Sequence, residues 1–201
     1  MKRNIILAII LIPILLVSIA VTILLNMPGL KSDLTVGLGP ETHSYLSVNV
    51  RDFTEAPLNA EVKVFLPISS AEAMAIVADF SAYETWVSPP PKTAVIVDNS
   101  RATGETFGVG SHVSYSEGET DIIEYFDQDT AMIAKPLWGT NDFEGHRGVV
   151  IVVPHQGGVI VHMRRYFETK SMKGVFMSKM MPMFMKSSAQ NLADIHNGEV
   201  L

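Results

Sequence analysis

Five methionines surround one proline in the stretch FMSKMMPMFMK, which runs from Phe176 to Lys186. Thioether sulfur is a soft ligand, so clustered methionines can hold Cu(I) outside the cytoplasm. The chain has no cysteine, and no histidine lies in this stretch to complete such a site. Methionine is also a flexible filler of irregular cores and of pockets that admit variable ligands. We therefore expect these residues to pack a core or a pocket, and we predict no metal and no cofactor.

The other residues suited to chemistry form no catalytic signature. No two of the six histidines have the four-residue spacing of a metal site on a helix. His162 with Glu124 or Arg164 could form a general acid–base pair, as an enzyme that removes a proton next to a carbonyl requires. There is no Ser-His-Asp arrangement and no phosphate-binding loop. Four aromatic residues could line a cavity, although core packing is the simpler interpretation for each: Trp86, Tyr115, Tyr125 and Trp138.

The first elements that would position these residues begin at Glu61. The segment EVKVFLP (61–67) alternates like a strand and ends at a proline. Ser69 precedes Glu72 by three residues, which is the spacing of a capping box, and Ser81 and Glu84 repeat it. We expect two short helices here, ended by the three prolines at 89–91.

Strands and one long helix fill the rest of the chain. Alternation and turn residues predict six strands, at about 93–98, 111–117, 119–126, 130–138, 145–153 and 158–168. YLSVNV (45–50) also alternates like a strand. After Lys170 the period becomes helical, and the apolar stripe has these members: Met177, Met181, Phe184, Ser188, Leu192 and Ile195. Pro182 lies inside this helix and predicts a kink or a restart. Either the first half of the helix moves as a lid, or the kink is static.

This order of elements resembles the SRPBCC superfamily, the START-like or polyketide-cyclase-like proteins. The residues that carry the resemblance lie within VFLPISSAEAMAIVADFSAYETWVSP (64–89), GVGSHVSY (108–115), IIEYFD (122–127) and VVIVVPHQGGVIVHMRRYFE (149–168). The resemblance covers about residues 60–198, and His162 stands where many members have tryptophan. It implies an α+β helix-grip fold, in which a curved antiparallel sheet wraps around the long C-terminal helix. It also implies an apolar cavity between sheet and helix. The residues expected to line that cavity are Trp86, Tyr115, Tyr125, Trp138, His162, Met177, Met181 and Phe184.

The N-terminal segment is suited to a membrane. Ile5 to Leu25 is an apolar run of 21 uncharged residues, long enough to cross a bilayer as a helix. A secretory signal cleaved after Ala20 would leave a very apolar new N-terminus, so we favour an uncleaved anchor over residues 1–25. Lys2 and Arg3 favour a cytoplasmic N-terminus and an extracytoplasmic C-terminal domain. Residues 26–44 are rich in glycine, proline and polar residues and read as a linker to a domain over 45–201.

The charge of the chain limits the kinds of partner that it can bind. Without residues 1–25 the chain has 13 basic and 21 acidic residues, so nucleic acid is a poor partner. Between Arg164 and Lys186 there are six basic residues and one acidic residue, Glu168. These are either ordinary solvated faces, which is the simpler interpretation, or a surface that rests on anionic lipid.

Three functions fit the sequence. The first is a membrane-tethered domain that binds or carries a hydrophobic small molecule or lipid without catalysis. The second is a cyclase-type or hydratase-type enzyme that uses the same cavity. The third is a tethered protein-interaction module with a filled core.

Overall fold

A computed structural model describes residues 48–201, except 105, 116, 117 and 119, and seven earlier positions: 12, 13, 15, 17–19 and 22. The chain divides into two compact units, Met1–Asp33 and Leu34–Leu201. In the first unit the seven described positions are helical and exposed. Among the described residues, no helix is both long enough and apolar enough to cross a bilayer. Most of the predicted anchor and the whole linker lie outside the described residues, so both stay predictions.

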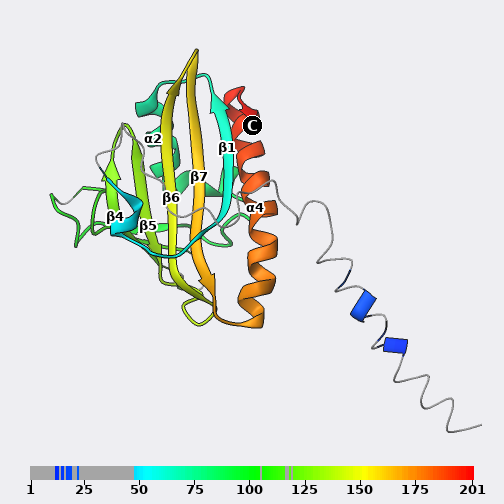
Figure 1. Cartoon of the computed structure of the whole chain (residues 1–201). Helices are drawn as coiled ribbons and strands as arrows, with labels where there is room; N and C mark the ends of the chain where they lie inside the picture. Colours follow the sequence, from blue (N-terminus) through cyan, green and yellow to red (C-terminus); the bar gives the residue numbers. More distant parts are fainter. Residues whose placement is uncertain are drawn as a thin grey trace, which may run out of the picture. The chain divides into compact units, whose positions relative to one another are not determined.

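One antiparallel sheet dominates the described part of the second unit (Figure 1). Its strand order is β2-β3-β4-β5-β6-β7-β1-β8. The strands are β1 (Leu58–Leu66), β2 (Ile96–Asp98), β3 (His112–Ser114), β4 (Thr120–Asp127), β5 (Ala131–Pro136), β6 (Phe143–His155), β7 (Gly158–Thr169) and β8 (Glu199–Val200). The predicted meander and the predicted β6–β7 hairpin are confirmed, and β8 is an addition that pairs with β1.

The helices also follow the predicted order. After β1 come α2 (Ser70–Ala78), the short 3-10 helix η2 (Phe80–Ala82) and α3 (Tyr83–Trp86). The first predicted capping box is present, because Ser69 accepts from the amide of Glu72 while the Glu72 carboxylate accepts from the amide of Ser69. The second, at Ser81 and Glu84, is wrong, because the N-cap of α3 is Ala82 and no side chain caps it. The long helix α4 (Met172–His196) follows the meander, and the Ser171 side chain caps it by accepting from the Gly174 amide at 2.9 Å.

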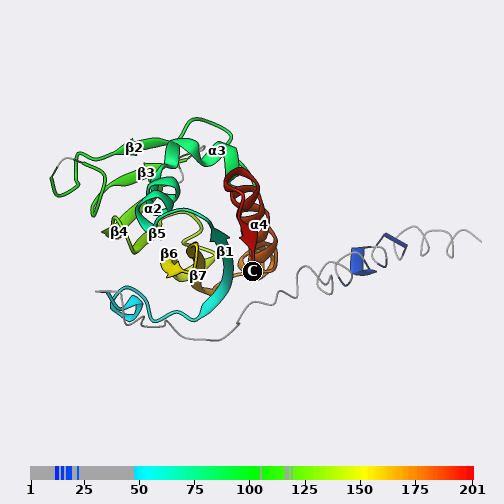
Figure 2. The ribbon, with the colours of Figure 1, turned by 90° about the horizontal axis from the view of Figure 1, so that it is seen from above.

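Both faces of the sheet are covered. The main hydrophobic cluster lies on the concave face and joins strand residues such as Val64, Val161 and Met163 to Met74 of α2 and Leu192 of α4. Seen from above, the strands follow a curve from β2 to β1, with α3 and α4 at its open side (Figure 2). A second, smaller cluster lies on the convex face, and its buried members are Val50, Leu58, Ile133, Val149, Ile151 and Tyr166.

The strand predicted to reach Val50 is wrong at its end, and of the two alternatives predicted at Pro182, a kink or a restart, the restart does not occur. Val50 does not continue a strand but begins the 3-10 helix η1 (Val50–Asp52), because the Asn49 side chain accepts from the Arg51 amide and so bends the backbone locally. At Pro182 the long helix does not restart, and α4 is one continuous helix in which Pro182 is buried. The loss of one backbone donor is therefore tolerated within the helix.

The predicted inner stripe of α4 is correct at Ser188 and Leu192, which are buried, and wrong at its other members. The buried residues of α4 are mostly small: Gly174, Pro182, Ser188, Ala189, Leu192 and Ala193. Phe184 is only half-buried, and Ile195 is 51% exposed. A Cβ atom at Gly174 would overlap the carbonyl oxygen of Asp142, so the start of α4 lies directly against the chain before β6. The inner face of α4 is therefore made mostly of small residues that let the helix lie close to its neighbours, and not of a row of large apolar side chains.

Candidate ligand-binding pocket

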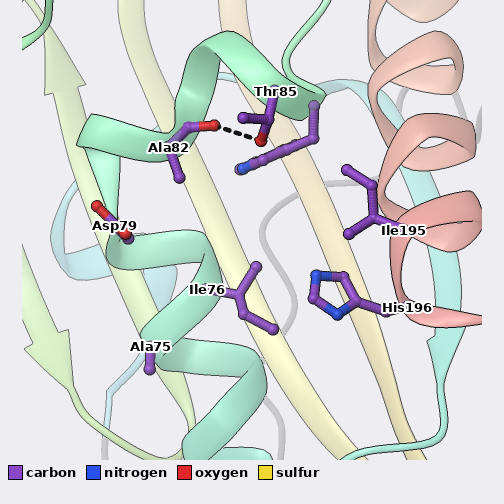
Figure 3. A pocket seen from close by; sticks show the side chains of 8 residues that line it. Ala75, Ile76, Asp79, Ala82, Thr85, Ile195 and His196 are labelled. Atoms are coloured by element: carbon purple, nitrogen blue, oxygen red, sulfur yellow. Dashed lines mark hydrogen bonds between the residues drawn. The ribbon is translucent and has the colours of Figure 1, made fainter.

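A pocket opens between α2, α3 and the C-terminal end of α4 (Figure 3). Its volume is about 340 Å³, and its lining residues are Ala75, Ile76, Asp79, Ala82, Thr85, Trp86, Ile195 and His196. The Thr85 hydroxyl donates to the carbonyl of Ala82 at 2.7 Å, so this hydroxyl already has an acceptor. A small cavity with apolar walls and a few polar groups is the usual form of a small-molecule site.

Trp86 is the largest side chain of this wall. It is 6% exposed, and its indole Nε1 is buried with no hydrogen-bond partner among the described residues. Two hydrogen bonds tie this part of α3 to α4: Asn191 Nδ2 donates to the carbonyl of Trp86 at 3.1 Å, and the Ser88 amide donates to Ser188 Oγ at 2.8 Å. The distance between α3 and the second half of α4, and so the width of the pocket, depends on these bonds.

A row of aromatic rings leads from Trp86 to a buried carboxylate. The ring of Tyr83 lies 4.9 Å from that of Trp86 and 6.3 Å from that of Tyr115. The Tyr115 hydroxyl donates to Asp121 Oδ2 at 3.1 Å, and Asp121 is 4% exposed. Burial first, and then the negative charge of Asp121, raise the pKa of both tyrosines above the usual value of 10. Both hydroxyls therefore stay protonated and act as donors.

Arg165 brings a positive charge to the same concave face. It pairs with Gly148 in the register of β6 and β7, and a Cβ atom on Gly148 would overlap the guanidinium. Its charge favours ionisation of Tyr83 and Tyr115, so it partly opposes the upward shift in their pKa. The side chain of Arg165 forms no hydrogen bond or ion pair with the part of the chain that the structure describes. The concave face thus holds a carboxylate, two phenols and a guanidinium.

Of the predicted site residues, Trp86 lines the pocket and Tyr115 lies behind it, with Tyr83 connecting the two rings. Tyr125 lies on the convex face, where its ring is 6.3 Å from that of Phe53. A bulge between Ile123 and Tyr125 explains this, since it turns two residues that simple alternation would place together toward opposite faces.

His162 also lies on the convex face, because it is between Val161 and Met163, which both belong to the concave cluster. Its Nδ1 is 3.3 Å from Glu61 Oε1, and Arg164 Nε donates to the same oxygen at 2.7 Å. Burial raises the pKa of Glu61, but the hydrogen bond with His162 and the charge of Arg164 outweigh it and hold the pKa to about 2. Neither His162 nor its predicted partner Glu124, which pairs with Arg147 at 2.6 Å, faces the pocket.

Trp138 belongs to another group, which we call the His146 cluster. The His146 ring is surrounded by three aromatic rings at 5.0, 5.4 and 5.6 Å, those of Trp138, Phe143 and Phe167. His146 is 5% exposed, and neither ring nitrogen has a hydrogen-bond partner among the described residues. No member of this cluster lines the pocket.

The three predicted residues of α4, Met177, Met181 and Phe184, are half-buried and do not line the pocket. Ile195 and His196, at the far end of the helix, do so instead. Three further residues of the concave face were not predicted as site residues: Tyr83, Asp121 and Arg165. The one available signal was Asp121, which falls on the apolar side of an alternating strand together with Ile123.

Comparisons with known proteins address the fold. No family model matches the chain, and no curated protein matches it. Among solved structures, a protein from Nitrosospira multiformis is 12% identical with a TM-score of 0.54, over 68% of this chain and 94% of that one. A START superfamily protein from Mycobacterium smegmatis is 14% identical with a TM-score of 0.52, over 69% of this chain and 96% of that one.

A third solved structure is the di-domain ARO/CYC StfQ of the steffimycin biosynthetic pathway. It is 11% identical with a TM-score of 0.50, over 66% of this chain and 47% of that one. At these identities the comparisons concern the fold alone. The α+β fold, with its curved antiparallel sheet and long C-terminal helix, is START-like.

Proposed function

We propose that this protein binds and carries a hydrophobic small molecule or lipid in the pocket between α2, α3 and the end of α4. The observation that carries the proposal is the pocket itself, whose volume of about 340 Å³ falls in the range of small-molecule sites. The apolar lining comes from Ile76, Trp86 and Ile195. The buried indole N–H of Trp86 favours a ligand that presents one hydrogen-bond acceptor. START-like neighbours agree with a cavity-forming fold.

Two exposed isoleucines provide a matched test. Ile195 is 51% exposed and lines the pocket, while Ile96 of β2 is 66% exposed and does not line it. Ile195→Trp should fill the pocket and lower the amount of apolar ligand that copurifies, measured by native mass spectrometry after mild purification. Ile96→Trp should leave that amount unchanged. Equal ligand content in the two variants would refute the assignment of the pocket.

We further propose that residues 1–25 tether this domain to a membrane, with the domain on the extracytoplasmic side. The support is the uncharged apolar run from Ile5 to Leu25 and the two basic residues before it. A reporter fused after Leu201 should be active only outside the cytoplasm, and extraction of the protein should require detergent. Release of the protein by alkaline carbonate alone would contradict the tether.

An enzyme of cyclase or hydratase type is the second candidate. It is favoured by the buried Asp121 carboxylate with its Tyr115 partner, and by Arg165, which faces the same interior without an ion pair to any described residue. A carboxylate can remove a proton next to a carbonyl, and a guanidinium can stabilise the resulting enolate. If Asp121→Asn keeps the bound ligand but stops its conversion, the enzyme is supported. If the wild-type protein never converts the isolated ligand, the result supports the carrier function instead.

A further inference from the structure

The first half of α4 presents apolar side chains to solvent. Four of them are exposed: Met172 (84%), Val175 (37%), Phe176 (47%) and Met183 (42%). Their helical spacing places them on one side of α4, and Lys179 and Lys186 follow the same side. Gly174, on the opposite side, is buried. We call the four apolar residues and these two lysines the outer stripe.

The charged residues in the first half of α4 are all basic. From Thr169 to Ala193 the chain has no acidic residue and four lysines: Lys170, Lys173, Lys179 and Lys186. Lys173 is 3.2 Å from the carboxylate of Asp142. The other three lysines form no ion pair with any described residue, and all three are exposed. Their charge is therefore available to a partner, although the chain as a whole is acidic.

The second half of the same helix has the opposite character. Its outward residues include Gln190 and Asp194, whose side chains bond to each other at 2.8 Å. The apolar and basic surface therefore ends at about Lys186 and is not a general property of α4. Exposed methionine and phenylalanine with flanking lysine is the composition of helices that lie in the interface of a membrane.

We propose that the outer stripe docks on an anionic lipid bilayer, with Met172, Phe176 and Met183 in the interface and the lysines among the headgroups. This inference rests on the proposed membrane tether and adds the surface that makes contact. Anionic headgroups attract each lysine near the surface. A linker over residues 26–44 would span roughly 24 Å, so a tethered domain would reach the bilayer at high effective concentration and a weak surface would suffice.

The outer stripe shares no residue with the pocket, which lies at the other end of α4. Docking and ligand binding can therefore be tested separately. Because the chain has no cysteine, one introduced cysteine carries a unique fluorescent label. We would label Phe176→Cys, or Gln190→Cys as the matched site in the polar half, with a dye that is sensitive to polarity. The whole chain would be reconstituted into phosphatidylcholine vesicles with or without phosphatidylglycerol.

The label at position 176 should shift to the blue and resist an aqueous quencher only in vesicles that contain phosphatidylglycerol. High salt should reverse both effects, and the label at position 190 should show neither. Lys179→Glu should lower the docked-to-free ratio about fivefold or more, whereas Arg101→Glu, an equal charge change away from α4, should not.

Three outcomes would overturn the proposal. The labels at 176 and 190 could behave alike in both kinds of vesicle. The label at 176 could be protected equally without anionic lipid. Its protection could instead rise with protein density in phosphatidylcholine vesicles, which would make the stripe an interface between copies of the chain. Ile195→Trp separates this test from the proposed carrier function, because it should remove the ligand and leave the shift at 176 intact.

Discussion

Replacing His146 with phenylalanine should make the stability of the domain less sensitive to acid. His146 is buried among three aromatic rings, and no described residue accepts or donates a hydrogen bond at its ring nitrogens. Burial first, and then the charges of Arg165 and Arg147, lower the pKa of His146 from 6.5 to about 2. The imidazole is therefore neutral in the folded protein at every pH above about 3.

The expected effect follows from proton linkage. Between pH 6.5 and pH 2 the unfolded chain binds a proton at position 146 that the folded chain does not bind, so folding becomes less favourable as the pH falls. At pH 5, which is 1.5 units below the ordinary pKa, the penalty is about 2 kcal/mol. For a domain of this size it corresponds to a fall of about 4–8 °C in the melting temperature.

The assay is thermal unfolding of the whole chain in a mild detergent at pH 7.5 and pH 5. Wild type should lose about 2 kcal/mol more than His146→Phe between the two values. At pH 7.5 the variant should be as stable as wild type or more stable, because it removes a buried N–H that has no acceptor among the described residues. His146→Gln, which also cannot titrate, should show the same weaker pH dependence whatever its starting stability.

Trp138→Phe is the control, since it alters the packing of the His146 cluster but keeps the imidazole. It should lower stability at both pH values and keep the wild-type difference between them. The reasoning is refuted if His146→Phe and His146→Gln lose as much stability in acid as the wild type does. That result would mean that His146 is protonated in the folded protein.

Three further changes test the packing and the convex face. Gly174→Ala should lower stability by about 1–3 kcal/mol, because its Cβ would overlap the carbonyl of Asp142; an unchanged melting temperature would contradict this. Ser188→Ala should cost about 1 kcal/mol, because the Ser88 amide loses its acceptor, and hydrogen exchange at that amide should become faster. Glu61 has its pKa lowered from 4.5 to about 2, so its stabilisation is complete above pH 4.5 and is lost as the pH falls to 2. Glu61→Gln should therefore remove about 3 kcal/mol of the loss that wild type shows over this range in acid denaturation.

The order of elements could be predicted because local signals agree with the fold. Ser69 and Glu72 form the capping box that their spacing predicts, and the glycines after His155 turn the chain into β7. These features depend on neighbours in sequence. They can therefore be predicted without knowledge of the rest of the molecule.

The faces of the strands could not be predicted in the same way. Apolar residues cover both faces of the sheet, so alternation does not say which set meets α4. In β7, Val161 and Tyr166 are both fully buried but on opposite faces. The bulge before Tyr125 also moves the side chains that follow it to the other face of the sheet, and no residue pattern predicts this bulge. His162 and Tyr125 were misplaced for these reasons.

The interior polar group was missed because its members come from distant elements. Tyr83 follows α2, Asp121 belongs to β4 and Arg165 belongs to β7. In the sequence Asp121 lies in an acidic run that reads as a solvated face. Only the pairing of β4 with β3 and β5 buries this carboxylate beside the Tyr115 hydroxyl.

The inner face of α4 was predicted wrongly in the first half of the helix, and this error and the proposed docking surface have one physical cause. Hydrophobic periodicity ranks methionine and phenylalanine above glycine, serine and alanine, so it selects the stripe with the largest side chains as the buried one. A helix that lies close to its neighbours needs small residues on the inner face instead, as the tight contact of Gly174 shows. The large apolar side chains of the first half must then point elsewhere. Met172 and Phe176 point to solvent, and a contiguous exposed apolar patch of this kind commonly marks an interaction surface.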